Sequence, residues 1–222
     1  MTRLQSPSRL ITPVALLIGL GCYVFTASAD ATEEDISRVN RSISIAAGLT
    51  VGDVSTVNGG IRLSAAAIAG EVHTVNGSIE LGARARVDSA ETVNGGIGIG
   101  EEVIVNGAVS TVNGNIAVNA GSEIERNIET INGEILLENS RIGGDLETAN
   151  GDVTLLQGAT VEGDIIIADQ RGWWNKLFSG NSRPLKLVID EKSSVKGRIH
   201  LYREVELHID PAADVGELIE HF

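Results

Sequence analysis

Hydrophobic and polar positions repeat along this chain with a period much longer than one strand or one helical turn. An Asn recurs seven times between positions 40 and 150, at spacings of 18, 18, 18, 19, 19 and 18 residues. Three and five places after each Asn stand aliphatic residues, as at Ile61 and Leu63. A spacing of two is the period of a β-strand, so each repeat contains a short strand with one apolar face.

Further apolar residues keep the same register on the other side of the Asn. One stands four places before it and another immediately before it, as at Val54 and Val57. The register continues after the last Asn, because Val161–Ile165 and Val195–Ile199 repeat the pattern of Ile142–Leu146. We therefore count about nine coils, the last two of them degenerate, and expect the aliphatic residues to point inward in columns.

The Asn marks a corner of the coil. Asn-Gly suits a tight corner because both residues tolerate positive φ, and Asn side chains stacked at one corner can form a hydrogen-bonded ladder. A Thr two places before the Asn is explained by strand propensity and ladder hydrogen bonds. The structural corner residues that are followed by Gly are Asn58, Asn76, Asn94, Asn113, Asn132 and Asn150.

These features together predict an all-β, single-stranded β-solenoid with coils of 18–19 residues. A strand of three or four residues cannot bury its face alone, but stacked coils pair each strand with its neighbours above and below. Asn-Gly hairpins in a sandwich are the alternative, yet hairpins would reverse the phase from turn to turn. A left-handed helix of hexapeptides also has 18 residues per coil, but its aliphatic residue at every sixth position is missing. We therefore favour a right-handed parallel β-helix.

The first 29 residues are typical of an export signal. Arg3 and Arg9 precede an apolar run from Ile11 to Phe25, and Ala27-Ser28-Ala29 is a small-residue cleavage site. The run is short for a transmembrane helix, although retention as an anchor and lipidation of Cys22 are alternatives. We expect residues 30–38 to form an N-terminal cap and residues 39–169 to form the regular coils, in an exported protein of the periplasm, cell envelope or surface.

Charge and composition exclude some classes of function. Without residues 1–29 the chain keeps 15 basic and 30 acidic residues, so its net charge is −15. A general basic field for nucleic acid is therefore excluded. Cys22 is the single cysteine and lies in the expected signal, which leaves no thiol chemistry in the exported chain. Aromatic residues make up 3%, which favours a narrow aliphatic core.

One insertion interrupts the repeat, at residues 170–183, before degenerate coils and a cap at residues 184–222. We favour a short helix that folds against the flank of the solenoid and covers its aliphatic residues. The aromatic and basic residues also suit an interaction loop that docks to a membrane interface or a protein, and this is the alternative. The candidate residues of this loop are Trp173, Trp174, Lys176, Leu177 and Phe178.

No catalytic, cofactor-binding or metal-binding residues are predicted. Asp145 and Asp164 occupy equivalent places on adjacent coils, as do Glu134 and Asp152, and such pairs suit either Ca²⁺ or a solvated polar face. We favour the polar face. The four His residues show no ligand spacing and no shared column. Polysaccharide-cleaving β-helices carry long loops on one face, whereas these coils are nearly loop-free.

The repeated Thr-Val-Asn-Gly and Val-x-Gly-x-Ile phrases resemble the adhesin-type β-solenoid domains of bacterial envelope proteins, and they are similar to the bactofilin solenoids. The resemblance covers about Val39 to Ile219. The bactofilin likeness implies a right-handed, three-sided helix that assembles end to end. Bactofilins are cytoplasmic or membrane-associated, whereas this chain carries an export signal.

The sequence thus predicts a non-enzymatic structural or interaction protein whose partner is a protein or an envelope polymer. Acidic residues before the first coil and in the last one, such as Asp35 and Glu220, favour a monomer or small oligomer by protecting the open strand edges. Membrane docking through the Trp-Trp loop is the first alternative. A polysaccharide-active enzyme is the second.

Overall fold

The computed structural model describes residues 34–168 and 184–222. These residues form short strands joined by turns and bends, with no helix among them. The strands run parallel and stack into a β-solenoid of about nine coils, as the repeat predicts. The expected signal and the Trp-rich insertion lie outside the described residues.

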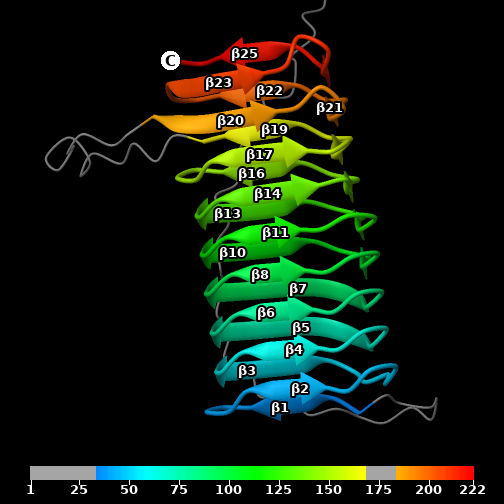
Figure 1. The fold of residues 1–222 in the computed structure, drawn as a ribbon. Helices are drawn as coiled ribbons and strands as arrows, with labels where there is room; N and C mark the ends of the chain where they lie inside the picture. Colours follow the sequence, from blue (N-terminus) through cyan, green and yellow to red (C-terminus); the bar gives the residue numbers. More distant parts are fainter. Residues whose placement is uncertain (1–33, 169–183) are drawn as a thin grey trace, which may run out of the picture. The chain divides into compact units, whose positions relative to one another are not determined.

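Each coil has three sides, which we call the first, second and third faces (Figure 1). The first face follows the Asn corner and carries one nine-stranded parallel sheet. Its strands are β2 (Ile43–Ile45), β4 (Ile61–Leu63), β6 (Ile79–Leu81), β8 (Ile97–Ile99), β11 (Ile116–Val118), β14 (Ile135–Glu138), β17 (Val153–Leu156), β20 (Leu185–Ile189) and β23 (Val205–Ile209).

The second and third faces belong to one continuous sheet, because two long strands bend round the corner between them. These are β5 (Ile68–Asn76) and β7 (Arg86–Asn94). The second face adds β9 (Ile104–Val105), β12 (Glu123–Ile124), β15 (Arg141–Ile142), β18 (Thr160–Val161), β21 (Ser194–Val195) and β24 (Asp214–Val215). The third face adds β1 (Ile36–Arg38), β3 (Val54–Asn58), β10 (Val109–Asn113), β13 (Ile128–Asn132), β16 (Leu146–Thr148), β19 (Ile165–Ile167), β22 (Ile199–Leu201) and β25 (Leu218–Glu220).

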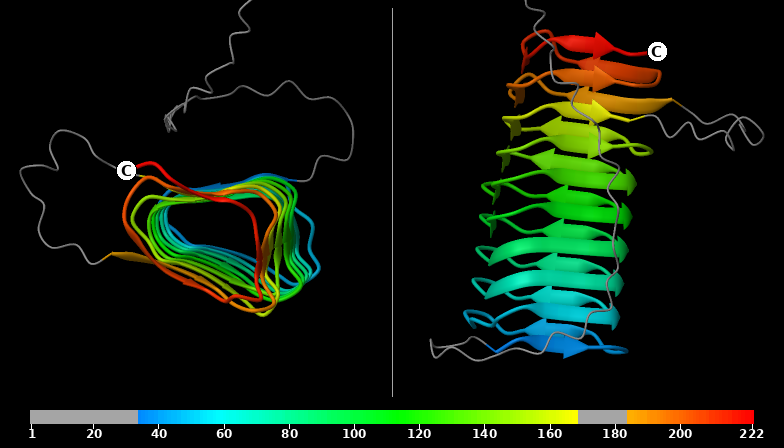
Figure 2. Two further views of the ribbon diagram at one scale, coloured as in Figure 1. Left: turned by 90° about the horizontal axis from the view of Figure 1, so that it is seen from above. Right: turned by 180° about the vertical axis from the view of Figure 1, so that it is seen from behind.

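The coil is right-handed. In Figure 1 the chain rises from β1 at the bottom to β25 at the top, and β20 runs from left to right at the front. Seen from above in Figure 2, β20 lies along the lower side and β25 returns leftward along the upper side. The chain therefore turns counter-clockwise as it rises toward the viewer.

Register is kept from one end of the solenoid to the other. Asn76 pairs with Asn94 in the neighbouring coil, and every strand of the first face pairs with its equivalent in the same way. Beyond the insertion the pairing resumes without a slip, because Val153 pairs with Leu187. Ile36–Arg38, inside the segment expected as a cap, pairs with β3 as the outermost strand of the third face.

The core consists of inward columns of Ile, Leu, Val and Ala. The largest fully buried side chains are all Ile or Leu, and no aromatic residue is among the described core residues. Dispersion contacts along each column and the parallel hydrogen bonds reinforce one another, since each coil covers the apolar ends of the next. The core therefore stabilises the stack as a whole rather than any single coil.

One expected inward column points outward instead. Val57, immediately before the Asn, is 40% exposed, whereas Thr56 beside it is 2% exposed. The strand period of two places these neighbours on opposite sides, and the inward side is already set by Val54. The Thr-Val pair of each motif therefore buries its Thr and turns its Val outward, the reverse of their hydrophobicity.

The expected role of positive φ at the Asn-Gly corner is wrong. Among the described residues, positive φ occurs at another corner, between the first and second faces. The residues there are Gly48, Ala66, Arg84, Glu102, Gly121, Asn139, Gln157 and Gly158. At the Asn corner, Gly is required by close approach: a Cβ on Gly95 would collide with the carbonyl of Gly77 in the coil below.

Candidate functional site

The corner Asn residues form the expected ladder along the solenoid. The Nδ2 group of each Asn donates to Oδ1 of the Asn one coil below, at 2.7–3.0 Å. The bonds run without interruption from Asn150 down to Asn40. Because donor and acceptor are both used within the ladder, these side chains hold the coils in register, which is a structural role.

A second row of bonds lies just inside the ladder. The buried Thr hydroxyl of one coil donates to the corner carbonyl of the coil below, as Thr92 does to Gly77 at 2.9 Å. The same bond is made by Thr56, Thr74, Thr111 and Thr130. Strand propensity and ladder hydrogen bonds were expected to explain this column; the hydroxyls do form a row of hydrogen bonds along the stack, and the acceptor in each is a backbone carbonyl. A buried carbonyl needs such a partner.

The guanidinium group of Arg203 binds the last Asn of the ladder. Nη1 of Arg203 donates to Oδ1 of Asn150 at 3.0 Å and to the carbonyl of Ala149 at 3.1 Å. Arg203 belongs to the coil that follows the insertion, so its long side chain reaches back along the stack. The Asn ladder and the C-terminal coils are therefore tied together by a side chain as well as by the sheets.

An exposed aliphatic ridge runs beside the Asn ladder on the third face. It consists of the residue that precedes each Asn: Val39, Val57, Val75, Val93, Val112 and Ile131. Val39, Val57 and Ile131 are more than one third exposed, and the other three are half-buried. A row of outward aliphatic side chains that repeats once per coil is typical of a contact surface. We call this row the valine ridge.

Three of the four acidic residues singled out in the sequence bind backbone N–H groups through their carboxylates. Oδ1 of Asp145 accepts the N–H of Asp164 at 2.8 Å, and Oδ1 of Asp164 accepts the N–H of Arg198 at 2.7 Å. Asp152 in the same way accepts the N–H of Lys186 at 2.9 Å. Within the described residues no group of three or more His, Cys, Asp or Glu could hold a metal ion.

Two glutamates stack on the outside of the third face. Glu129 and Glu147 are paired neighbours on β13 and β16. Burial raises the pKa of the Glu147 carboxyl, and the negative charges of Glu129 and Asp145 raise it further. This side chain therefore costs stability when it is ionised, because it is partly desolvated among like charges.

Two histidines meet near the C-terminus, although the sequence indicated no shared position for them. Nδ1 of His200 lies 3.1 Å from Nε2 of His221, and Nε2 of His200 lies 3.6 Å from Oδ2 of Asp164. The His221 ring stacks on Tyr202 at a centroid distance of 4.3 Å. These contacts hold the residues after β25 against the third face. Spacing alone could not reveal them, because His221 lies beyond the last strand.

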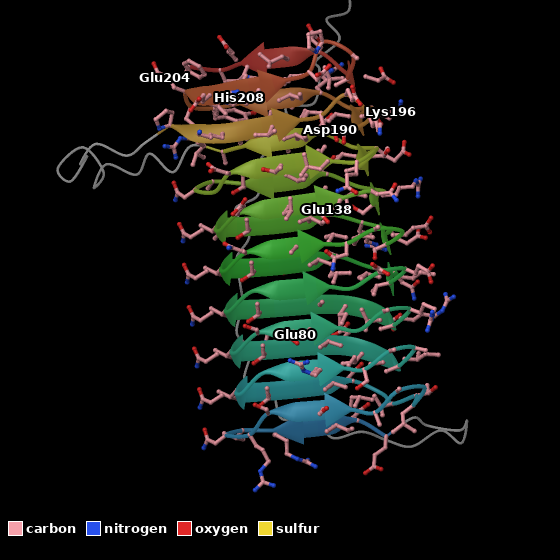
Figure 3. All side chains as sticks on the ribbon, in the orientation of Figure 1. Glu80, Glu138, Asp190, Lys196, Glu204 and His208 are labelled. Atoms are coloured by element: carbon pink, nitrogen blue, oxygen red, sulfur yellow. The ribbon has the colours of Figure 1, made fainter. Side chains whose placement is uncertain are left out.

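An open hollow lies at the C-terminal end. It is lined by apolar groups of Leu201, Val205 and Phe222 and by acidic Glu204 and Glu220. Figure 3 shows Glu204 and Lys196 on opposite sides of these last coils. No helix among the described residues is long and apolar enough to cross a membrane.

Comparisons with protein-family models, curated proteins and solved structures find no match for this chain. The resemblance to adhesin-type and bactofilin solenoids therefore stays a prediction. The same holds for the interaction loop, since Trp173, Trp174, Lys176, Leu177 and Phe178 lie outside the described residues.

Proposed function

We propose that this chain is an exported, non-enzymatic structural or interaction protein of the cell envelope, which presents its third face to a protein or polymer. The single observation that carries the proposal is the valine ridge, a row of outward aliphatic side chains that repeats once per coil. The Asn ladder and the inner Thr bonds next to the ridge hold its coils in register, so binding would cost little ordering of the surface.

The roles of the acidic residues support a non-enzymatic protein. Asp145, Asp152 and Asp164 hold backbone N–H groups of neighbouring coils, which is a structural use of the carboxylates that a hydrolase would need for acid–base chemistry. A screen for sugar release from envelope polysaccharides is expected to detect none. Release that depends on Asp145 or Asp164 would overturn this part of the proposal.

The ends of the solenoid bear on assembly. Within the described residues the strands at both ends have no further coil to pair with, and acidic residues such as Glu34 and Glu220 stand beside or in them. Repulsion between like charges opposes end-to-end pairing, so we expect a monomer or small oligomer. Long filaments of the processed chain in negative-stain microscopy would contradict this.

Photo-crosslinking in intact cells tests the contact surface. A photoreactive residue replaces Val93 on the valine ridge or, as the control, Ala117, which is half-buried and points outward from the first face. We expect a defined crosslinked species in the envelope fraction from position 93 and none from position 117.

A matched variant shows whether the ridge itself makes the contact. Val75→Lys combined with Val112→Lys places charges on either side of Val93 and should abolish the crosslink, while circular dichroism shows that the fold persists. Recovery of the chain in the cytosol, or equal crosslinking from both positions, would overturn the proposal.

A further inference from the structure

The Asn-Gly peptides at the corners carry a latent reaction of their own. The backbone nitrogen of the Gly, after losing its proton to hydroxide, can attack Cγ of the preceding Asn. The N–Cγ bond forms, the Cγ–Nδ2 bond breaks, and Nδ2 leaves as ammonia with a proton from water. Water then opens the five-membered succinimide to aspartate or isoaspartate. Gly favours this reaction because it has no Cβ to hinder the attack.

Four of these peptides are locked in the folded chain. The N–H of Gly59 donates to the carbonyl of Asn76 in the next coil at 3.0 Å. The same bond, also at 3.0 Å, is made by Gly77, Gly95 and Gly114. The attacking nitrogen is therefore already engaged. Both its deprotonation and the rotation that would bring it to Cγ require this bond to break.

The carbonyl of the same corner residue is held as well. Thr74 binds the carbonyl of Gly59, and Thr92, Thr111 and Thr130 bind the next three in turn. Each of these four Gly residues is thus fixed through both its N–H and its C=O. A corner held at both groups resists the backbone movement that ring closure demands.

The fifth corner, Asn132–Gly133, lacks both restraints. Within the described residues the N–H of Gly133 has no hydrogen-bond acceptor. The hydroxyl of Thr148, which would hold its carbonyl by the pattern of the other coils, is buried without a partner. Among the six Asn-Gly peptides of the Asn ladder, two separate observations therefore point to Asn132–Gly133. The sixth, Asn150–Gly151, is left out of the comparison because Arg203 also binds Asn150.

We propose that Asn132–Gly133 is a site of spontaneous deamidation in the folded protein, whereas Asn58, Asn76, Asn94 and Asn113 are protected by their corner bonds. The product loses Nδ2 of residue 132, which donates to Asn113 at 2.9 Å, so the Asn ladder is cut at this coil. The modification also adds a negative charge to an acidic protein. An isoaspartyl link would lengthen the backbone of a coil whose length is set by stacking.

Peptide mapping by mass spectrometry tests the site. The processed protein is incubated in mildly alkaline buffer, and aspartate and isoaspartate are quantified at each Asn over time. We expect residue 132 to react at least about fivefold faster than the four protected residues, since one or two hydrogen bonds contribute to each lock. A rate at residue 132 no higher than at the protected corners would overturn the proposal.

Two controls separate the fold from the local sequence. In urea the five peptides should react at similar rates, because each is an Asn-Gly pair without its corner bonds; a persistent lead of residue 132 in urea would contradict the proposal. Thr130→Val removes the hydroxyl that holds Gly114 and should accelerate Asn113 severalfold. An unchanged rate at Asn113 would show that the Thr bond is no part of the lock.

Discussion

The regular coils and the C-terminal coils share a core and the close-packed glycines of one corner, but they differ at the other two corners. Ile116 in the middle of the stack and Ile199 near its end are both fully buried in continuous inward columns. The regular coils use the Asn ladder and the Thr hydroxyls, whereas residues 184–222 have neither and contribute Arg203, which binds the last Asn of the ladder. The core columns therefore define a coil, and the Thr-Val-Asn-Gly motif is one of several ways to close it.

The turns between the first and second faces show the same contrast. In the regular coils a residue such as Arg84 or Glu102 adopts φ of about +60°. In the described C-terminal coils no residue has positive φ, and a carboxylate closes each turn instead. Asp190 accepts the N–H groups of Lys192 and Ser193, and Asp210 accepts that of Ala212. Backbone strain in one region is replaced by side-chain hydrogen bonds in the other.

The largest expected effect concerns the feature that the two regions share. Ile116→Ala and Ile199→Ala should each destabilise the protein by about 2–5 kcal/mol, because both remove a fully buried side chain and leave a cavity. Urea unfolding followed by circular dichroism measures the cost. A small effect of Ile199→Ala with a separate unfolding step would show that the C-terminal coils are an independent unit.

The next largest loss of stability is expected at the corner glycines, which lie close to the backbone of the coil below. Gly95→Ala should destabilise by about 1–3 kcal/mol, and Gly197→Ala by a similar amount, since each new Cβ would meet a carbonyl one coil below. Gly98→Ala is the matched control, because a Cβ there has nothing within 4 Å. Equal losses for Gly95→Ala and Gly98→Ala in thermal unfolding would mean that close approach is not the reason for the corner glycines.

The Thr hydroxyls just inside the Asn ladder distinguish most regular coils from the coil of Thr148, whose hydroxyl is buried without a hydrogen bond. Thr92→Val leaves the carbonyl of Gly77 without its partner and should cost about 1–2 kcal/mol. Thr148→Val removes a buried hydroxyl that has no partner, so it should be neutral or stabilising. Chemical denaturation of the two variants side by side decides the point; a loss for both would show that Thr148 has a bonded role.

Asp190 tests the closure of the C-terminal turns. Partial burial acts to raise the pKa of Asp190, but hydrogen bonds from the Ser193 hydroxyl and from the N–H groups of Gln157, Lys192 and Ser193 outweigh it and lower the pKa. A lowered folded pKa means that this stabilisation is present above the unfolded pKa and is lost as the pH falls through the folded value.

Asp190→Asn should therefore destabilise the C-terminal coils at neutral pH by about 1 kcal/mol, and the loss should fade in acid. Hydrogen exchange of the last coils over a pH series measures it. Arg84→Gly is the contrasting variant and should be neutral or slightly stabilising, because Gly relieves positive φ. A loss that does not depend on pH would contradict the carboxylate's role.

The smallest effect is expected at Glu147, where the pKa is raised. A raised folded pKa means that stability is highest below the unfolded pKa and is lost as the pH rises through the folded value. Glu147→Gln should stabilise the protein at neutral pH by about 0.2–1 kcal/mol, since the side chain is only partly buried and water screens the charges. Thermal unfolding in acid and at neutral pH should show the gain only at neutral pH.

Coil length, strand register and most of the core could be predicted from the sequence. A solenoid is built from contacts between neighbouring coils, so the period of Ile61, Ile79 and Ile97 already defines which residues stack. The Asn ladder follows from the same period. The number of coils was also predictable, because Val161 and Val195 keep the register where the Asn is lost.

The tertiary structure alone decided how each corner is made. The motif does not reveal that Thr56 points inward and Val57 outward, because facing depends on where the whole coil bends. Nor does it reveal that positive φ lies at Arg84 while Gly95 is needed for close approach. The period of the chain is a local property, whereas the direction of a side chain at a corner is set by closure of the complete turn against the coils above and below it.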